Sequence, residues 1–511
     1  MKMLSIFCCG LLATVALAAD PTEADYYTIT DIPVPEGIVF EVSGIELLPD
    51  NKIAACSRRG DVYVIANAFD DDTTNDEWTL FASGLHEPLG LSWYDGWLWC
   101  TQRPEVTKMK DVDGDGRADI FECVSDDWGI KGDYHEYAFG TQHDKDGNIW
   151  IVLCLTGSGG AASDYRGWCV RVNADGTFLP TTSGIRSPGG IGFNHKGDVF
   201  YGDNQGLWNG TSSVKHLKPG SFQGNPTGNI YYPLTDAIGE RPVDPVSGSR
   251  IIVERQKVKE LVPPAINLPH GIVGKSTSGL THDSSGGKFG PFNEQLLVLD
   301  QGFSNIVRCS LEEVNGVYQG AAFHFRKGFG SGNIAARMSS DGDLFIGGTN
   351  RGWGSVGRKA GALERVNWTG KVPFEVHAVR ITETGFKLTF TEPVDPATVQ
   401  DLSGYALQAY TYIYQKGYGS PQVDKVEPML ESVSVSADGL SATLTLDKIY
   451  KGHTYQMQFT NIRSAKGLPL LHNEAFYTVN EVLGEEIIFG AEAKPEAKPA
   501  AEPAGKPEAK E

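Results

Sequence analysis

An acidic run in the first third of the chain has the spacing of a calcium-binding loop. Carboxylates stand at positions one, three, five, nine and twelve of residues 111–122, and glycine stands at position six. Calcium takes about six to eight oxygen ligands, and this spacing wraps them around one ion. The alternative is an acidic Asp-Gly turn without an ion. The predicted ligands are Asp111, Asp113, Asp115, the carbonyl of Arg117, Asp119 and Glu122.

Polar side chains also follow strand-like segments at four places along the chain. If these segments belong to one repeating architecture, the polar groups surround a common mouth, where amides, carboxylates and guanidinium groups suit a polyhydroxylated ligand. The alternative is that they satisfy loop backbones and one another. The candidates for ligand binding are Gln102, Arg103, Glu105, Asn204, Gln205, Gln301, Asn350, Arg351 and Trp353.

Four residues are candidates for catalysis. His135, with Glu136 beside it, could take a hydroxyl proton, because the pKa of histidine lies near neutrality. Arg186 could stabilise a developing anion. Asp203 and Asp300, with Glu105 and Glu136 as alternatives, are the carboxylates among which a glycoside hydrolase would find its pair. A single histidine, taken alone, more often has a structural role.

Short strands introduced by hairpin signals would position these groups. Examples are Asp95-Gly96 before residues 97–100, Asp146-Gly147 before residues 148–152 and Asp341-Gly342 before residues 343–346. The first four repeats are about 45–50 residues apart, as in four-stranded propeller blades. We predict an all-β protein with a six-bladed β-propeller over residues 38–370, and an insertion between about Gly206 and Leu280.

The remaining segments lack the blade period. Alternating strands over residues 371–483 predict an immunoglobulin-like β-sandwich, interpreted as a spacer. Residues 484–511, mostly Ala, Lys, Pro and Glu, predict a disordered tail. Residues 1–19 have the basic start, apolar core and small-residue end of a signal peptide, followed by a lead over residues 20–37.

Charge and hydropathy argue against a nucleic-acid partner and against a transmembrane segment. A formal net charge of -20 repels phosphate backbones, so we expect no nucleic acid. No segment is apolar for long enough to cross a bilayer, so we expect no transmembrane segment.

Six cysteines follow the signal peptide, which permits disulfides in an exported chain but is equally compatible with buried thiols.

Several motifs in the first three quarters of the chain resemble a known family. They are Thr101-Gln102-Arg103-Pro104-Glu105, His135-Glu136-Tyr137-Ala138-Phe139-Gly140, Gly184-Ile185-Arg186-Ser187-Pro188 and Thr349-Asn350-Arg351-Gly352-Trp353-Gly354. They resemble secreted bacterial dehydrogenase-like propeller proteins, which are distantly similar to glucose/sorbosone dehydrogenases that use pyrroloquinoline quinone. The resemblance implies a secreted or periplasmic bacterial protein, pyrroloquinoline quinone as cofactor and His135 as the base. It departs from the quinone enzymes at Ser187, where they have asparagine.

Three functions follow as hypotheses. The first is oxidation of an aldose or glycan by a sugar dehydrogenase-like protein, and the second is hydrolysis of extracellular glycans by a sialidase-like propeller. The third is recognition of a glycan without turnover. In each case the expected partner is an extracellular sugar or glycan.

Overall fold

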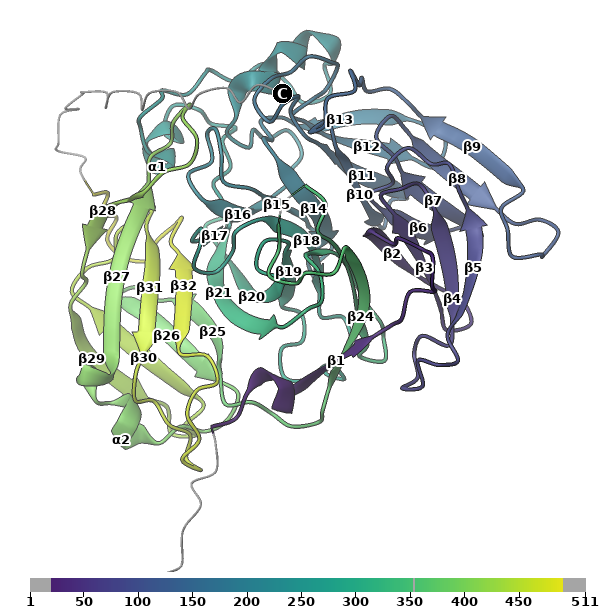
Figure 1. Cartoon of the computed structure of the whole chain (residues 1–511). Helices are drawn as coiled ribbons and strands as arrows, with labels where there is room; N and C mark the ends of the chain where they lie inside the picture. The colour runs from purple at the N-terminus through teal and green to yellow at the C-terminus, as the bar shows by residue number, and fades with distance from the viewer. Residues whose placement is uncertain (1–19, 353, 490–511) are drawn as a thin grey trace, which may run out of the picture.

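The protein is described by a computed structural model over residues 20–352 and 354–489. The expected signal peptide, Trp353 and residues 490–511 of the expected tail lie outside the described residues. Strands make up nearly all of the regular structure, which confirms the predicted all-β class (Figure 1). Among the described residues, no helix has the length and hydrophobicity needed to span a bilayer.

Six antiparallel four-stranded arrays form a ring. Each first strand packs against the first strand of the next array, and β22 packs against β2 to close the circle. The first two arrays are β2 (Val42–Leu48), β3 (Lys52–Ser57), β4 (Val62–Ala66) and β5 (Glu77–Ala82), then β6 (Leu91–Tyr94), β7 (Trp97–Thr101), β8 (Val106–Lys110) and β9 (Ile120–Ser125). The third and fourth are β10 (Ala138–His143), β11 (Asn148–Leu153), β12 (Cys169–Asn173) and β13 (Phe178–Thr182), then β14 (Pro188–Phe193), β15 (Val199–Asp203), β16 (Ser212–His216) and β17 (Ile266–Leu268). The fifth and sixth are β18 (Thr277–His282), β19 (Leu296–Asp300), β20 (Asn305–Val314) and β21 (Val317–Lys327), then β22 (Asn333–Met338), β23 (Leu344–Thr349), β24 (Gly361–Trp368) and β1 (Tyr27–Asp31). This is a β-propeller-like fold.

The last array takes its outer strand from the start of the chain. β1 pairs with β24 from Tyr27 opposite Trp368 to Asp31 opposite Glu364, and the two strands lie side by side in Figure 1. Residues 20–37, expected as a lead, therefore contribute a strand to the ring. This pairing joins the two ends of the ring by backbone hydrogen bonds.

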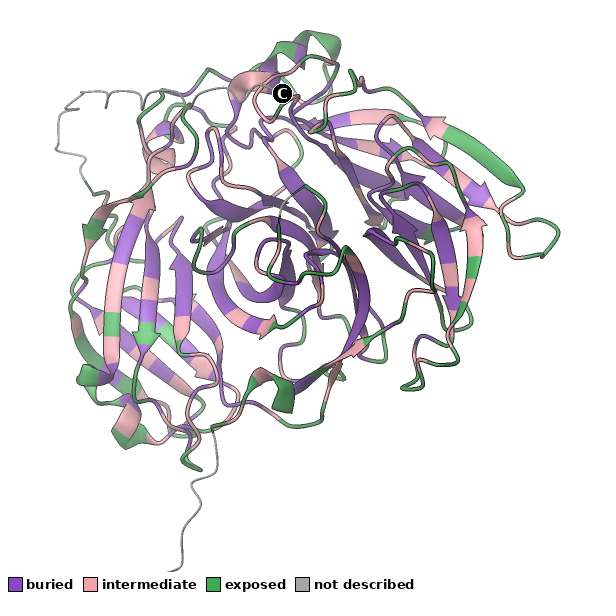
Figure 2. Cartoon of the chain, viewed as in Figure 1, coloured by how far each residue is buried: buried purple, intermediate pink, exposed green. Residues whose placement is uncertain are grey.

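Apolar clusters lie between neighbouring arrays. Val42 and Ile45 pack with Phe345 and Leu363 between the first and last arrays, and comparable clusters separate the others. Figure 2 shows this burial along the inner strands, whereas the outer strand β9 is largely exposed. The alternation of apolar and polar residues, from which the strands were predicted, therefore arises because neighbouring sheets bury their facing sides against each other.

Glycines allow the first strands to approach one another at the axis. A Cβ added to Gly90 would lie 2.9 Å from the carbonyl oxygen of Gly140, and one added to Gly279 would lie 2.3 Å from that of Ile334. Only ≈ 30 Å³ remains between the strands at this level, lined in part by Gly44 and Gly190. The ring therefore has a nearly closed axis rather than an open pore.

An additional β-domain follows the ring and shares a sheet with it. One of its sheets is β25 (Val376–Ile381), β26 (Gly385–Phe390), β30 (Ser441–Leu446) and β29 (Leu430–Val435). The other contains β32 (Glu474–Thr478), β31 (Thr454–Phe459), β27 (Tyr405–Tyr412) and β28 (Gln422–Val426). Because β32 pairs with β21, this second sheet continues the fifth array into one eight-stranded sheet. A flexible spacer would not be joined in this way.

The helices are short, and the cysteines of the described residues are unbridged. Residues 217–265, within the predicted insertion, contain η2 (Pro226–Leu234) and α1 (Ile251–Glu254). The other helices are η1 (Glu23–Asp25), α2 (Pro396–Val399) and η3 (Leu402–Gly404). Cys56, Cys100, Cys154, Cys169 and Cys309 are buried thiols and Cys123 is exposed.

His472 lies where the N-terminal segment meets the ring and the additional domain. Its Nδ1 is 2.6 Å from Glu375 Oε1 and its Nε2 is 3.1 Å from Glu23 Oε1. The other carboxylate oxygen of Glu23 accepts a hydrogen bond from the backbone amide of Lys327 in β21. Burial lowers the pKa of His472, but Glu375 and Glu23 outweigh burial and raise it to about 9. The junction therefore stabilises a charged imidazolium.

We expect stability to fall as pH rises through this pKa. The folded-state pKa of about 9 exceeds the unfolded value, so the contribution of His472, about 3 kcal/mol or less, is complete below about pH 6.5 and lost as pH rises through the folded pKa. His472→Gln should flatten the decline in the free energy of unfolding between pH 6 and pH 9, measured with urea. His195→Gln, at an exposed position, is the control. Parallel profiles for wild type and His472→Gln would contradict the assignment.

Candidate functional site

One face of the ring carries a cavity of ≈ 730 Å³. In an antiparallel array, the connection from the second to the third strand emerges at the same end as the connection to the next array. Arg58, Asn204, Gln301 and Arg351 come from the first kind of connection, and His135 comes from the second. Topology therefore brings together residues that are far apart in the sequence.

The cavity is lined by basic groups. Arg58, Arg186, Lys275 and Arg351 contribute formal positive charges, and His135 and His270 add two imidazoles. No aspartate or glutamate occurs among the described residues that line it. In a chain of net charge -20, this concentration of cations is local. It favours an anionic ligand.

Carboxylates behind the wall hold two of the arginines. Arg58 Nε donates to Glu87 Oε1 at 3.0 Å, and its Nη2 donates to the Tyr137 hydroxyl at 2.9 Å. Arg351 Nη1 lies 3.3 Å from Glu41 Oε2, while its side chain remains 43% exposed. Burial raises the pKa of Glu87, but Arg58 and Arg103 outweigh burial and lower it. The acids thus orient the cations without lining the cavity.

Three buried polar atoms at the wall have no hydrogen-bond partner among the described residues. They are Arg186 Nε, Asn204 Oδ1 and Thr277 Oγ1, and all three residues line the cavity. Arg186 is only 6% exposed, and its Nη1 donates to the Gln205 carbonyl at 3.0 Å. Buried polar groups are normally paired, so a ligand or ordered water is expected to complete these sites.

His135 faces the cavity and has a carboxylate beside it. Its Nδ1 lies 3.5 Å from Asp133 Oδ1, and its side chain is 37% exposed. The neighbour expected from the sequence, Glu136, points elsewhere, because its carboxylate accepts from the Lys131 amide and the Thr156 hydroxyl. Asp133 is therefore the group that can orient His135.

Burial lowers the pKa of His270, which lines another part of the same cavity.

Asp203 and Asp300 lie behind the cavity wall. Asp203 Oδ2 is 2.9 Å from Lys215 Nζ, and its Oδ1 accepts from the Ser187 amide. Asp300 accepts three hydrogen bonds of 2.7 Å, from the amides of Lys275, Ser276 and Phe303. Burial raises the pKa of Asp300, although these amides oppose the rise. Both carboxylates hold loops that line the cavity, and neither is among the residues that line it.

The predicted binding residues divide into two groups. Asn204, Gln205, Gln301 and Arg351 line the cavity. Gln102, Arg103, Glu105 and Asn350 support loops: Arg103, for example, donates to the carbonyls of Asp133 and Tyr134, next to His135. Trp353 lies outside the described residues.

Several lining residues were not predicted. Arg58 directly follows β3, as Asn204 directly follows β15, so the same positional rule would have found it. Lys275 lies within the predicted insertion, where no repeat marked it. Tyr418 belongs to the additional domain, and no sequence signal connects it with the ring.

Asp203 and Lys215 form a buried ion pair with side chains 1% and 3% exposed. We expect Lys215→Met to lower the free energy of unfolding by about 3–5 kcal/mol, because it leaves an uncompensated buried charge. Lys288→Met, at an exposed pair with Asp341, should cost about 1 kcal/mol or less. Urea unfolding measures both. If Lys215→Met kept wild-type stability but lost ligand binding, the result would contradict the structural role and indicate that Asp203 acts in function.

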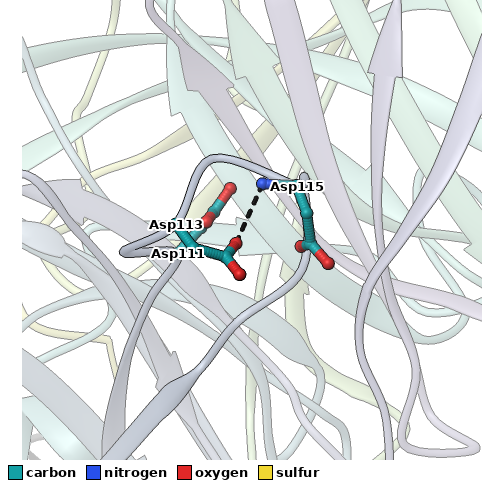
Figure 3. A group of neighbouring side chains, drawn as sticks. All are labelled: Asp111, Asp113 and Asp115. Carbon is teal, nitrogen blue, oxygen red and sulfur yellow. Dashed lines mark hydrogen bonds between the residues drawn. The ribbon is translucent and has the colours of Figure 1, made fainter.

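The predicted calcium loop joins β8 and β9 and lies at the opposite end of its array from the cavity. Asp111, Asp113 and Asp115 place carboxylate oxygens within 4.8 Å of one another. Figure 3 shows the three side chains together on this loop. Asp119 instead accepts hydrogen bonds from the amides of Val112 and Asp113. Glu122 pairs with Lys108 Nζ at 2.9 Å. Three of the six predicted calcium ligands therefore lie close together. The backbone amide of Arg117 donates to Asp115.

The chain is similar to one family model and to several solved structures. A family model described as a domain of unknown function (DUF7133) matches residues 48–283. No curated protein matches the chain. A putative oxidoreductase (glucose dehydrogenase) from Thermus thermophilus has 15% identity and a TM-score of 0.48, covering 66% of this chain and 99% of its own. The PQQ-bound aldose sugar dehydrogenase from Streptomyces coelicolor has 13% identity and a TM-score of 0.47, covering 68% and 100%. Values this low assign no activity to this chain.

Proposed function

We propose that the protein is sugar dehydrogenase-like and that its cavity holds pyrroloquinoline quinone beside an aldose. The observation that carries the proposal is the cavity wall, which contains four cationic side chains and no carboxylate among its described residues. Pyrroloquinoline quinone carries three carboxylates and several carbonyl oxygens. The two oxygens of a carboxylate match the paired N–H donors of an arginine guanidinium, and a lysine ammonium can also donate to them.

The residues divide the work between binding and proton transfer. Arg58, Arg186, Lys275 and Arg351 would hold the carboxylates of the quinone. When bound, the quinone would supply a two-electron acceptor. His135, oriented by Asp133, would accept the proton of a sugar hydroxyl. Asn204 and Thr277 are further polar residues of the cavity lining.

The same wall does not favour a glycoside hydrolase. Hydrolysis at a glycosidic bond ordinarily uses two carboxyl groups that flank it. Asp203 and Asp300 are occupied by Lys215 and by backbone amides. The other two proposed carboxylates, Glu105 and Glu136, accept hydrogen bonds from Gln102 and Thr156 and do not line the cavity either. The cationic wall does fit a second function, which is recognition of an acidic sugar without turnover.

A titration with pyrroloquinoline quinone tests the proposal. We expect saturable binding, followed by reduction of the quinone on addition of one of a panel of aldoses. Arg351→Gln should weaken binding about tenfold to a hundredfold, the value of a hydrogen bond between charged groups. His135→Ala should bind the quinone but lose reduction by about 100-fold or more.

Lys288→Ala, a change of exposed charge away from the cavity, is the matched control. Absence of quinone binding in the wild type would refute the cofactor assignment. Binding of uronic or sialic acids without any product would then support recognition of an acidic sugar.

We also propose that Asp111, Asp113 and Asp115 bind calcium in a structural role. Calcium at 100 times its dissociation constant should stabilise the fold by about 2.7 kcal/mol, seen as a rise in melting temperature. Asp113→Asn should remove that rise, whereas Asp72→Asn, in an exposed turn of the first array, should retain it. Equal melting temperatures with calcium and with a chelator would show that the loop is an acidic turn.

A further inference from the structure

The additional domain reaches the cavity through the connection between β27 and β28. Residues of this connection pair with two loops of the ring: Tyr418 bridges Leu207, and Tyr414 bridges Ser249. The Gly419 amide donates to the Gly206 carbonyl at 2.9 Å, and the Trp208 amide donates to the Gln415 carbonyl at 2.8 Å. This connection is therefore fixed to the ring by its backbone.

Side chains reinforce the attachment on both sides of Tyr418. Tyr414 is 2% exposed, packs edge-on against Trp208 at 5.0 Å, and donates its hydroxyl to the Gly224 carbonyl. Arg250 donates to both carboxylate oxygens of Asp424, at 2.7 and 3.1 Å. The position of Tyr418 thus follows from contacts between the two domains, and the shared β21–β32 sheet fixes the same geometry.

Tyr418 lies over Arg186 at the cavity wall. The Arg186 guanidinium carbon is 5.2 Å from the centre of the Tyr418 ring. A Cβ at position 206 would lie 2.2 Å from that carbon, so glycine there leaves room for the guanidinium. Although Tyr418 lines the cavity, it remains 63% exposed. The backbone around Tyr418 is fixed, its ring is exposed, and the buried Arg186 Nε beside it has no hydrogen-bond partner within the described part of the chain. An exposed aromatic ring beside an unpaired buried donor is typical of a binding site.

We infer that Tyr418 is a specificity-determining residue that stacks against the pyranose ring of the sugar. One face of a pyranose presents C–H groups, which pack on an aromatic face, while its edge hydroxyls and any carboxylate can reach Arg186 and Asn204. The inference rests on the proposed sugar-binding role of the cavity and does not depend on the quinone. It gives the additional domain a part in selecting the substrate.

Sugar binding by the full chain tests the inference. Dissociation constants for neutral hexoses and hexuronic acids are measured by calorimetry or saturation-transfer NMR, without quinone. Tyr418→Ala should weaken the preferred sugar about fivefold to tenfold, and Tyr418→Phe should retain its affinity. Phe121→Ala, which removes an exposed ring from β9, is the matched control. The quinone dissociation constant is measured separately, because Tyr418 lies over Arg186, which the cofactor proposal assigns to the quinone.

The outcomes separate the two proposals. Sugar affinity that depends on Tyr418 in a chain that binds no quinone would support this inference and refute the cofactor assignment. Unchanged sugar affinity in Tyr418→Ala, with melting temperature also unchanged, would overturn the inference and leave the cofactor assignment intact. A wild type without affinity for any sugar in the panel would overturn both the inference and the sugar-binding role.

Discussion

The close approach of the first strands at the axis is the constraint on which the rest of the structure depends. At Gly90 and Gly279 the next strand leaves no room for a side chain. With the axis nearly closed, loops from successive arrays converge on one small area. The same narrowing closes the bottom of the large cavity, so its ligand must enter from the loop side. Cations that are scattered along the sequence thereby become neighbours.

Local signals predicted the strands well but could not identify distant partners. Turns such as Asp95-Gly96 and Asp146-Gly147 correctly placed β7 and β11, because hairpin geometry is set by a few adjacent residues. The pairing of β1 with β24 and of β32 with β21 was not predicted. Alternation shows that a segment is a strand with one buried face, but it carries no information about which remote edge it joins.

The site could be located from the sequence more readily than its residues could be given roles. The rule that polar groups follow the second strand of each array found Asn204, Gln301 and Arg351, and applied after β3 it would also have found Arg58. The rule could not distinguish Asp203 from Asn204. The direction of the Asp203 carboxylate depends on Lys215, which is placed by another strand. Tyr418 was beyond any repeat-based argument, since it lies outside the repeats.

The pairing of β1 with β24 also constrains the order in which the chain can fold. The ribosome makes β1 first, yet its partner is made only after every other array has been completed. Until then β1 has no partner, and β21 presents an unpaired edge from its own synthesis until β32 emerges. Contacts between such distant segments are slow to form because a long loop must close first. A nascent chain therefore carries an unpaired β1 for most of its synthesis and an unpaired β21 edge near its end, and each can pair with another chain before its own partner is made.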